Sequence, residues 1–330
     1  MAEWTEIFKF DPLSPLERVS NLAVRLNTRK FLLDEETDPS GDLWTSKEVE
    51  RIFRRQHESG FWKYPAGNLV VRTQENYNQL ETYRQLGFLV EKYMLNKKHT
   101  SIQKACDFLL SFQTTEGDIR GIYGNQYTPN YTAGILELLI KAGYTNDPRV
   151  LKGLEWLLSI RQNDGGWAIP IRTRRLKLDS ITPQYKMEAV LPDRKKPFSH
   201  LVTGVVLRAL AVHPKYSKIE ETLKAGELLI DRFFKADTYS DRKSPDFWCK
   251  FAFPFWFTDL LSALDSLASL NHTLEKEKIN EAVQYFITTQ SDSGLWTSLK
   301  LLKIKGTIAH QWISMVITRT IKRLVLNANP

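Results

Sequence analysis

A short motif occurs four times in this chain, each time where an apolar helical pattern ends. In each copy a glutamine is followed four residues later by a glycine and then by a tryptophan or the residue that replaces it. The copies occupy residues 56–62, 113–119, 162–167 and 290–296. The last two glutamines are 128 residues apart, against 57 and 49 for the earlier pairs, so a degenerate fifth copy is expected within residues 228–241. A motif that repeats together with its context indicates a repeat architecture, and it predicts an array of helical hairpins.

Each residue of the motif suits the end of a helix. Glutamine both donates and accepts hydrogen bonds, so it can pair with carbonyl groups of the last helical turn and with amides of the next loop. Glycine tolerates the left-handed conformation that often caps a helix. The aromatic residue can fold back over the helix end and close the apolar layer. The motif therefore predicts a repeated turn with a structural role.

Two kinds of helix alternate between the copies of the motif. Helices with few charges are expected to be buried, and helices with one charged face are expected to line the surface. The apolar kind is expected at residues 15–26, 76–95, 131–142, 199–212, 255–270 and 308–326. The amphipathic kind is expected at residues 46–55, 100–112, 148–161, 218–234 and 276–289. The alternation predicts an all-α fold, an (α/α)6 toroid of about six hairpins without a sheet, in which an outer ring encloses an inner ring.

The motif is spread along the chain, so residues 1–330 are expected to form a single domain. Residues 171–197 interrupt the helical pattern with a long loop that is rich in arginine and lysine. Loops of this length in compact domains often serve a function. We expect this loop either to be solvated or to contact a diphosphate group or an anionic lipid surface.

The composition restricts the location and the partners of the protein. The net charge of +8 and the isoelectric point near 9.2 favour an anionic partner, either a phosphorylated substrate or a membrane surface. No nucleic-acid recognition motif occurs in the sequence, so no nucleic acid is expected as a partner. The two cysteines are far apart, and the first ten residues lack the apolar run of a signal peptide. A cytoplasmic location is therefore expected, with peripheral membrane association left open.

Residues 158–167 read Leu-Ser-Ile-Arg-Gln-Asn-Asp-Gly-Gly-Trp, and this segment resembles the QW repeat of squalene and hopene cyclases. The α/α toroid of the protein prenyltransferase β subunits is related, so the chain resembles this superfamily over about residues 46–326. The resemblance implies an enzyme that acts on an isoprenoid or another hydrophobic substrate in a central aromatic cavity. Because the repeat builds a scaffold, it specifies the fold more closely than the activity.

The catalytic motif of one branch of this superfamily is altered here. Class II terpenoid cyclases carry Asp-x-Asp-Asp followed by Thr-Ala at the start of an inner helix, and the central aspartic acid protonates the substrate. This chain has the Thr-Ala pair at Thr132 and Ala133, but residues 128–131 read Thr-Pro-Asn-Tyr. An amide and a phenol are too weakly acidic to protonate an alkene. We therefore expect a reaction that does not use this acid.

A zinc site is suggested by the resemblance to the other branch. Protein prenyltransferases bind zinc with an aspartate and a cysteine before one inner helix and a histidine at the start of a later one. Here Asp246 and Cys249 precede the helix expected at 255–270, and His310 opens the last one. These groups suit a zinc site with an open fourth position. The alternative is a buried cysteine and a structural histidine, and nothing in the sequence requires a cofactor.

The substrate cavity is expected where the inner helices begin. Their N-termini should gather at one mouth, where backbone dipoles favour anions. The side chains expected to line it are mostly aromatic with a few polar groups, the composition of a small-molecule site. The cavity residues are expected to be Tyr77, Asn130, Trp256 and Trp312. The partner would be a hydrophobic small molecule such as a prenyl diphosphate.

His200, His310 and Tyr131 are candidate catalytic residues at this mouth. The two histidines are the ones expected on inner helices, and imidazole suits general acid or base chemistry near neutral pH. The alternative for each is a hydrogen-bonded structural role. Tyr131 takes the last position of the altered acidic motif.

Asp259 is the fourth catalytic candidate. It is expected within an apolar helix, where an unpaired carboxylate is costly. Two interpretations follow: Asp259 pairs with Arg208 or Arg319, or it acts as an acid with a raised pKa.

Three functions are compatible with the sequence. The first is an enzyme that acts on an isoprenoid in the aromatic cavity. The second is a non-catalytic module that binds a lipid or a protein there. The third is a glycan-active α/α barrel, which needs paired carboxylates at the mouth, and Glu75 with Asp246 is the pair that the sequence offers.

Overall fold

The structure is a computed structural model, and it describes residues 3–65, 73–176, 188–239, 242–302 and 306–328. The described part consists of helices joined by turns, and the all-α prediction is confirmed. Its only strands are β1 (Lys250–Phe251) and β2 (Lys300–Leu301), which pair in parallel. This short pair corrects the expectation that the fold would contain no β structure.

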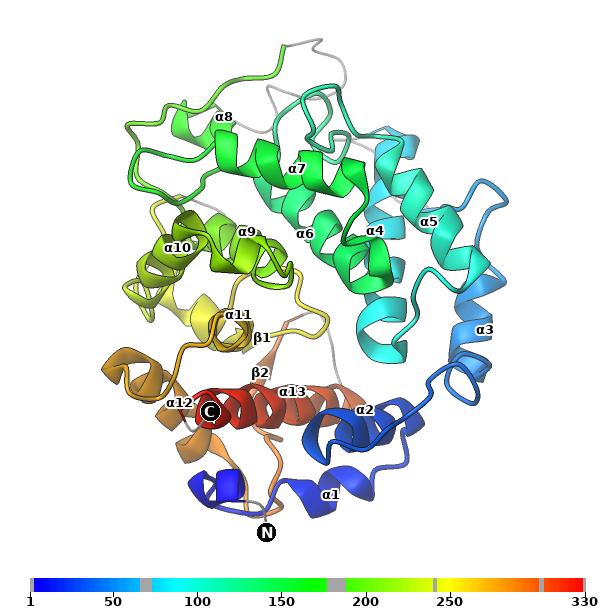
Figure 1. The fold of residues 1–330 in the computed structure, drawn as a ribbon, viewed down its shortest axis with the longest axis vertical. Helices are drawn as coiled ribbons and strands as arrows, with labels where there is room; N and C mark the ends of the chain where they lie inside the picture. The colour runs from blue at the N-terminus through cyan, green and yellow to red at the C-terminus, as the bar shows by residue number, and fades with distance from the viewer. Residues whose placement is uncertain (1–2, 66–72, 177–187, 240–241, 303–305, 329–330) are drawn as a thin grey trace.

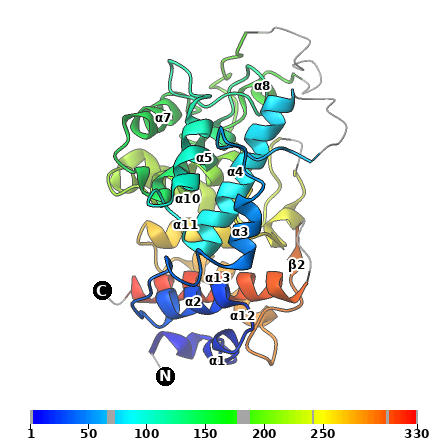
Figure 2. The same ribbon diagram turned by 90° about the vertical axis from the view of Figure 1, so that its right-hand side faces the viewer.

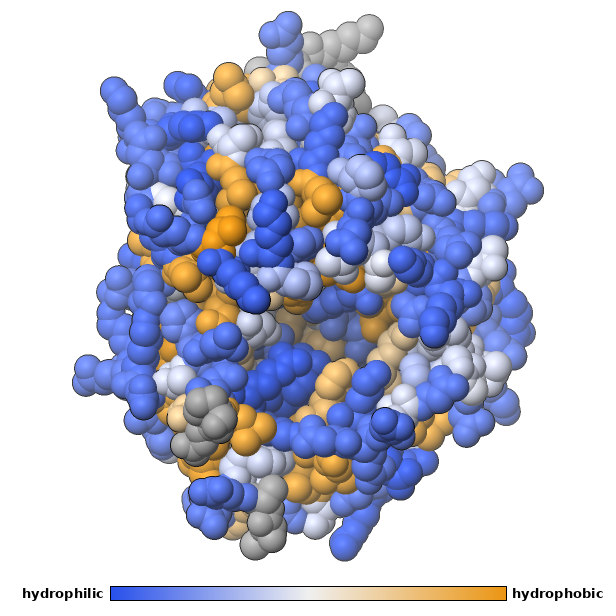
Figure 3. Space-filling view, viewed as in Figure 1, coloured by the Kyte–Doolittle hydropathy of each residue, from blue (hydrophilic) through white to orange (hydrophobic). Residues whose placement is uncertain are grey.

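The inner helices follow one another around the centre of the molecule. Each helix of this set contacts the next, and α13 contacts α2, so the contacts form a closed cycle (Figure 1). The set comprises α2 (Leu22–Leu32), α4 (Gln74–Tyr93), α6 (Pro129–Leu139), α9 (His200–Ala211), α11 (Leu260–Ser269) and α13 (Thr307–Leu326). Seen from the same side, the space-filling surface is hollowed at its centre, and much of the floor is hydrophilic (Figure 3).

A second set of helices packs outside the first. It comprises α3 (Lys47–Phe53), α5 (Thr100–Leu110), α7 (Pro148–Ser159), α10 (Glu220–Ile230) and α12 (Glu277–Thr289) (Figure 2). Burial distinguishes the two sets as expected. In α9 every residue except Leu201 is buried. In α12 the buried residues are Ile279, Ala282, Val283 and Phe286, whose spacing forms one helical face.

Short elements complete the described part. They are η1 (Glu3–Ile7), α1 (Leu13–Glu17), the π-helical turn η2 (Ile140–Tyr144), α8 (Pro170–Thr173), η4 (Tyr216–Lys218) and η5 (Pro245–Cys249). No helix in these ranges is both long enough and apolar enough to cross a membrane.

The motif glutamines join one hairpin to the next. Gln113 Nε2 donates hydrogen bonds to Gly117 O at 2.8 Å and to Arg149 O, in the first turn of α7, at 2.7 Å. Gln56 makes the same pair of bonds, to Gly60 O and to Ser101 O in α5. The amide therefore satisfies two carbonyl groups at once and ties each turn to the following outer helix. Gln162 differs, because its amide donates to two carbonyl groups of the 171–197 loop.

The glycine and the tryptophan of the motif explain its fixed spacing. Gly60 has a φ of +92°, and a Cβ atom on it would lie 2.2 Å from Lys104 O. Only glycine allows both this backbone conformation and this approach. Trp62 Nε1 donates to Ile52 O in the preceding outer helix at 2.8 Å, and Trp167 and Trp296 make the equivalent bond. The expectation that the aromatic residue folds back over the helix is confirmed for these three copies.

The degenerate copy expected within residues 228–241 is not confirmed, because this stretch contains neither glutamine nor glycine. Helix α10 ends at Ile230, and the indole of Trp248 donates to Lys235 O at 3.0 Å. Trp248 is buried and meets Phe233 edge to face at 5.4 Å, but Lys235 lies beyond the end of α10, so its bond differs from the bonds that Trp62, Trp167 and Trp296 make. Residues 240 and 241 lie outside the described residues.

Two inner helices start later than the sequence predicts. The helix expected at 15–26 is divided into α1 and α2, because Asn21 caps a new helix by accepting a hydrogen bond from Val24 N. The helix expected at 255–270 begins at Leu260, because Asp259 and Ser262 form a capping box. Residues 255–259 therefore precede α11 and do not form its first turn.

Candidate functional site

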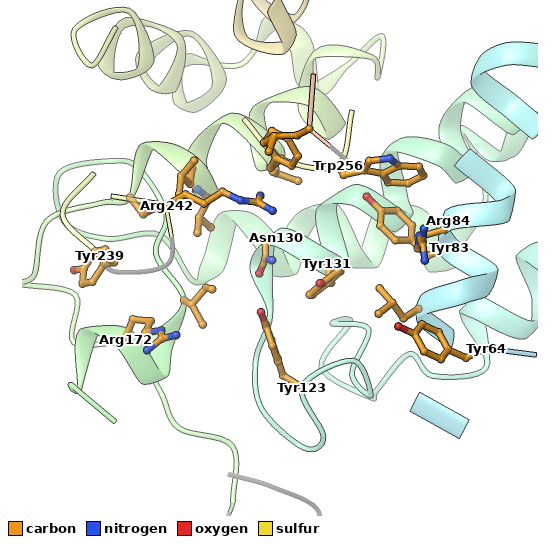
Figure 4. A pocket seen from close by; sticks show the side chains of 18 of the residues that line it. Tyr64, Tyr83, Arg84, Tyr123, Asn130, Tyr131, Arg172, Tyr239, Arg242 and Trp256 are labelled. Carbon is orange, nitrogen blue, oxygen red and sulfur yellow. Dashed lines mark hydrogen bonds between the residues drawn. The ribbon is translucent and has the colours of Figure 1, made fainter. Parts of the chain in front are cut away.

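A cavity of about 520 Å³ opens beside the inner helices α4, α6 and α9. This volume is within the range of small-molecule sites. Its walls come from α4, α6, α9 and the segment before α11 (Figure 4). The described lining residues are Tyr64, Leu80, Tyr83, Arg84, Phe88, Tyr123, Asn130, Tyr131, Ile169, Arg172, Ser199, Leu201, Val202, Val205, Tyr239, Arg242, Trp256, Phe257 and Leu302.

One face of α4 supplies much of the apolar wall. Leu80, Tyr83, Arg84 and Phe88 recur at helical spacing and all line the cavity. The residues expected from the sequence at the cavity do not include this set, although its spacing along an inner helix indicates one face. The same helix therefore contributes to the inner ring and to the wall of the site.

Trp256 contacts two other aromatic residues of the cavity wall. Its ring meets Tyr83 edge to face at 5.4 Å and Phe88 at 5.7 Å. Gly87 makes this approach possible, since a Cβ atom there would lie 2.5 Å from the Trp256 ring. Burial raises the pKa of Tyr83, so its phenol stays neutral. Tyr131 meets Tyr83 edge to face at 6.2 Å and extends the wall across the cavity.

Arginine side chains make the cavity basic. Figure 4 shows Arg172, Tyr239 and Arg242 on one side of the cavity and Tyr83, Arg84 and Trp256 on the other. The Arg242 guanidinium lies 4.0 Å from the centroid of the Phe257 ring. On the opposite side Arg84 is balanced by Glu81, at 3.1 Å. Within the described part of the chain, no aspartate or glutamate lines the cavity.

Asn130 lies between these two sides (Figure 4). It is the second residue of α6, and its Oδ1 atom is buried without a hydrogen-bond partner. A buried amide oxygen without a partner costs free energy. Asn130 therefore offers an unused acceptor to a ligand.

Three of the residues predicted from the sequence for this cavity line it. They are Asn130, Tyr131 and Trp256. Tyr77 is buried against Tyr64, with ring centroids 4.8 Å apart, and is not a lining residue. Trp312 stacks on Phe253 at 5.6 Å and is also outside the lining.

His200 lies behind the cavity wall. It is buried, stacks on Trp248 at 4.6 Å, and has its Nδ1 atom 3.4 Å from Asp237 Oδ2. Burial lowers the pKa of His200 to about 4, so the imidazole is neutral near neutral pH. Asp237 instead accepts hydrogen bonds from Ser199 Oγ and Leu201 N at the start of α9. These contacts support the structural alternative for His200.

Asp259 caps α11 and does not line the cavity. Its Oδ1 atom accepts a hydrogen bond from Ser262 N at 2.8 Å, and burial raises its pKa to about 7. Arg208 and Arg319, the two arginines expected to pair with Asp259, pair with other carboxylates. Arg208 Nε lies 2.9 Å from Glu137 Oε2, and Arg319 pairs with Asp265, so Asp259 has neither as a direct partner. Its raised pKa agrees with the second interpretation, but its position is that of a helix cap.

The residues of the suggested zinc site are not brought together. His310 Nδ1 lies 3.0 Å from Trp296 O, beside a separate small pocket. Asp246 is exposed. The side chains of Cys249 and Tyr285 share a hydrogen bond. In the described ranges no three histidine, cysteine or acidic side chains are placed to hold a metal ion. Glu75 is also exposed and, like Asp246, does not line the cavity, so the paired carboxylates of a glycan-active site are not found there.

The described part of the 171–197 loop contributes one side chain to the cavity. Arg172, in α8, is a lining residue. Arg174 donates to Leu191 O within the loop, and Arg194 donates to Ser159 O at the end of α7, so Arg194 holds the loop against this helix. Lys177 lies outside the described residues. Contact of this loop with a lipid surface stays a prediction.

Arg242, another basic side chain of the cavity, is not among the residues expected there from the sequence. It belongs to the turn that follows α10, where no periodic pattern marks the direction of a side chain. Tyr239 comes from the same turn, and its hydroxyl donates to Pro197 O at 2.6 Å. This bond joins the turn to the 171–197 loop, which brings Arg172 and Arg242 to one side of the cavity (Figure 4).

No family model matches the sequence, and no curated protein does. Among solved structures, a protein from Actinoplanes is 15% identical with a TM-score of 0.32, over 89% of this chain and 100% of that chain. The type II terpene cyclase MstE from Scytonema, in its apo form, is 13% identical with a TM-score of 0.33, over 85% of this chain and 96% of that chain. A variant of MstE in complex with its product, merosterolic acid A, is 12% identical with a TM-score of 0.34, over 86% and 95% of the two chains. At such TM-scores the likeness carries no conclusion about the ligand or the reaction of this chain.

Proposed function

We propose that this protein binds an isoprenoid ligand with an anionic head group, of which a prenyl diphosphate is the simplest example. The observation that carries the proposal is the charge of the cavity. Arginine side chains line it, and no carboxylate does so among the described residues. An anionic head group would accept charge-assisted hydrogen bonds from Arg172 and Arg242.

The apolar chain of this ligand would lie against the aromatic wall. Tyr83, Phe88 and Trp256 form one edge-to-face cluster opposite Arg172 and Arg242. Aromatic faces suit the flat double bonds of an isoprenoid chain, and the volume of about 520 Å³ suits a ligand of this size. The resemblance of the repeated motif to that of isoprenoid-acting enzymes also supports an isoprenoid over a straight alkyl chain.

Binding measured by isothermal titration calorimetry tests this proposal. Geranylgeranyl diphosphate should bind about tenfold to a hundredfold more tightly than geranylgeraniol, because hydrogen bonds to charged groups contribute roughly 1.5–3 kcal/mol. Arg242→Gln should remove much of this difference. Arg54→Gln is the matched control, because Arg54 is exposed and pairs with Glu50 on the surface. Equal affinities for the diphosphate and the alcohol would contradict the anionic head group, and tighter binding of hexadecyl phosphate would contradict the isoprenoid chain.

A second candidate function is turnover of this ligand. The faces of Tyr83, Phe88 and Trp256 would stabilise an allylic carbocation, and the guanidinium groups would stabilise the departing diphosphate. In this reaction the bond between carbon and oxygen breaks, and its electron pair leaves with the diphosphate. The remaining cation then adds water and loses a proton to give an alcohol, or loses a proton from carbon to give a hydrocarbon. Ionisation is favoured over protonation because no carboxylic acid faces the cavity in the described part.

Release of inorganic diphosphate from a bound prenyl diphosphate is the measurement for this second function. The wild type should release it together with a terpene alcohol or hydrocarbon that mass spectrometry identifies. Trp256→Leu should slow release more than it weakens binding. Tight binding without any release would leave the non-catalytic binding module as the function.

A further inference from the structure

Tyr83 brings a hydroxyl group to the aromatic wall of the cavity. The residue lines the cavity from α4, is 4% exposed, and meets Trp256 and Tyr131 edge to face. Within the described part of the chain, no hydrogen bond joins this hydroxyl to another residue. A buried tyrosine hydroxyl usually has a hydrogen-bond partner, and its lack of one costs free energy. A phenylalanine would give the same aromatic contacts without that cost, so packing alone does not explain the hydroxyl.

The hydroxyl of Tyr83 lies against the first turns of α6. A Cβ atom on Gly134 would be 2.4 Å from the Tyr83 hydroxyl oxygen, so the glycine leaves room for the phenol. Asn130 precedes Gly134 by four residues, and helical periodicity places both on one face of α6, a single turn apart. Tyr83 and Asn130 both line the cavity (Figure 4). The cavity therefore brings two polar side chains to neighbouring turns of one helix.

Asn130 and Tyr83 have complementary hydrogen-bonding groups. Asn130 Oδ1, the buried acceptor described above, has no partner. Burial raises the pKa of Tyr83, so the phenol keeps its proton near neutral pH and can donate. A group placed between the two side chains would have to accept from Tyr83 and donate to Asn130. A hydroxyl group does both, whereas the carbon atoms of a hydrocarbon chain do neither.

Other polar side chains of the lining are paired with protein groups. Ser199 Oγ donates to Asp237 Oδ2 at 2.9 Å, and the Tyr239 hydroxyl donates to Pro197 O. Arg84 pairs with Glu81 at 3.1 Å. These groups are satisfied without a ligand, so they do not distinguish a hydroxylated chain from a plain one.

We propose that the ligand of the cavity carries a hydroxyl group on its isoprenoid chain, and that Tyr83 and Asn130 bind this hydroxyl together. The proposal rests on the function proposed above, because it concerns the apolar part of the same ligand. Arg172 and Arg242 lie on the side of the cavity opposite Tyr83 (Figure 4), so the hydroxyl belongs to the chain and not to the head group. The class of ligand is therefore a hydroxylated prenyl diphosphate.

Such a site discriminates strongly against a chain without the hydroxyl. When a plain hydrocarbon chain occupies the cavity, the Tyr83 hydroxyl and Asn130 Oδ1 both stay unpaired and are cut off from water. A site that is built to bind a hydroxyl group rejects the analogue that lacks it for this reason. The hydroxylated ligand should therefore bind at least about tenfold more tightly than the plain one.

Isothermal titration calorimetry of the full-length protein with matched pairs of ligands tests the proposal. The pairs are geranyl, farnesyl and geranylgeranyl diphosphate, each with and without a hydroxyl group on its last isoprene unit. Several lengths are used because the length of the chain decides whether the hydroxyl reaches α6. In at least one pair the hydroxylated member should bind at least about tenfold more tightly.

Variants assign this preference to the two residues. Tyr83→Phe and Asn130→Ala should each bring the two affinities of that pair to within about threefold, because each removes one hydrogen bond to the hydroxyl. Both variants should bind the plain ligand about as well as the wild type does, which also reports that they are folded. Tyr93→Phe is the matched control, because Tyr93 lies on α4 but not among the lining residues, and it should keep the wild-type preference.

Equal affinities of the wild type within every pair would overturn the proposal, because water would then satisfy the two groups. A preference that persists in both variants would also overturn it, since the hydroxyl would be bound elsewhere. Where Tyr83→Phe fails to fold, Asn130→Ala decides alone. The prenyl alcohols and their hydroxylated forms separate this proposal from the function on which it rests. A preference for the hydroxylated alcohols, together with diphosphates that bind no more tightly than alcohols, would uphold the hydroxyl and contradict only the anionic head group. Binding of none of these ligands would overturn both.

Discussion

Gly60 is held at a φ of +92° with the carbonyl group of Lys104 where a side chain would begin. Gly60→Ala should lower the free energy of unfolding by at least about 2 kcal/mol, because the alanine would be strained and the contact with α5 would open. Urea unfolding measures this change. Gly41→Ala is the control, since nothing lies within 4 Å of a Cβ atom there, and it should change stability by less than about 1 kcal/mol. Similar losses in both variants would contradict the close approach.

Asp259 should make the stability of the protein depend on pH. Burial raises its pKa to about 7, above the value near 3.9 of an unfolded aspartate, so the folded protein keeps a proton that the unfolded chain loses between these pH values. Stability from this group is therefore complete below about pH 4 and is lost as the pH rises to about 7. Asp259→Asn keeps a helix cap without this proton. Relative to that variant, the wild type should lose a few kcal/mol over this interval in guanidinium unfolding, and parallel curves for the two proteins would rule this out.

The site also shows what single residues reveal from sequence alone. Asn130, Tyr131 and Trp256 could be placed at the cavity, because they lie at or before the start of inner helices. His200 and Trp312 also lie near the start of inner helices. Their side chains point away from the cavity, however, and stack on Trp248 and Phe253. The direction of such a side chain depends on tertiary contacts, which a single sequence does not contain.

At the scale of an element, the helices could be predicted well and their ends less well. Apolar and amphipathic patterns located both sets of helices, because burial on all sides and burial on one side leave different patterns. The errors concern caps. Asn21 and Asp259 each start a helix inside a stretch whose apolar pattern continues, and their competing hydrogen bonds determine the boundary. The turn that carries Arg242 has no pattern, so its contribution to the cavity could not be predicted.

The hydrogen bonds of Gln113 connect two hairpins, so their loss should weaken the packing of one hairpin on the next. Gln113→Ala removes the bonds to Gly117 O and Arg149 O, and should lower the free energy of unfolding by about 1–3 kcal/mol and the melting temperature by roughly 2–6 °C. Calorimetry measures both. Gln284→Ala on the exposed face of α12 is the control and should change stability by less than about 0.5 kcal/mol. An unchanged melting temperature for Gln113→Ala would show that water replaces the lost donor.

At the scale of the whole molecule, the first residues complete the series of hairpins. Gln290 makes the bonds of the other motif glutamines, but its second acceptor is Phe10 O, in the segment before α1. Phe10 N in turn donates to Gln290 Oε1, and Phe8 meets Trp296 edge to face at 6.0 Å. The N-terminal segment therefore takes the place that the following outer helix has for Gln56 and Gln113.

Phe8→Ala should weaken this closing contact. Removing a buried phenylalanine costs about 3–5 kcal/mol, and Phe8 is only 8% exposed between Trp4 and Trp296. Limited proteolysis should then cut first near residues 3–12, and urea unfolding should show the loss of stability. Phe234→Ala, at a side chain that is 41% exposed, should have a much smaller effect. Resistance of Phe8→Ala to proteolysis at wild-type levels would contradict this role.

The contact between Phe10 and Gln290 joins residues that are 280 positions apart. At about 5–20 residues per second, roughly 15–60 s pass between the synthesis of one and the synthesis of the other. During that interval α2 has no α13 to cover it, and the apolar side of an open arc is exposed to other proteins. We therefore expect that chaperones bind the nascent chain at α2, and that premature termination before residue 290 yields aggregates rather than a smaller folded protein.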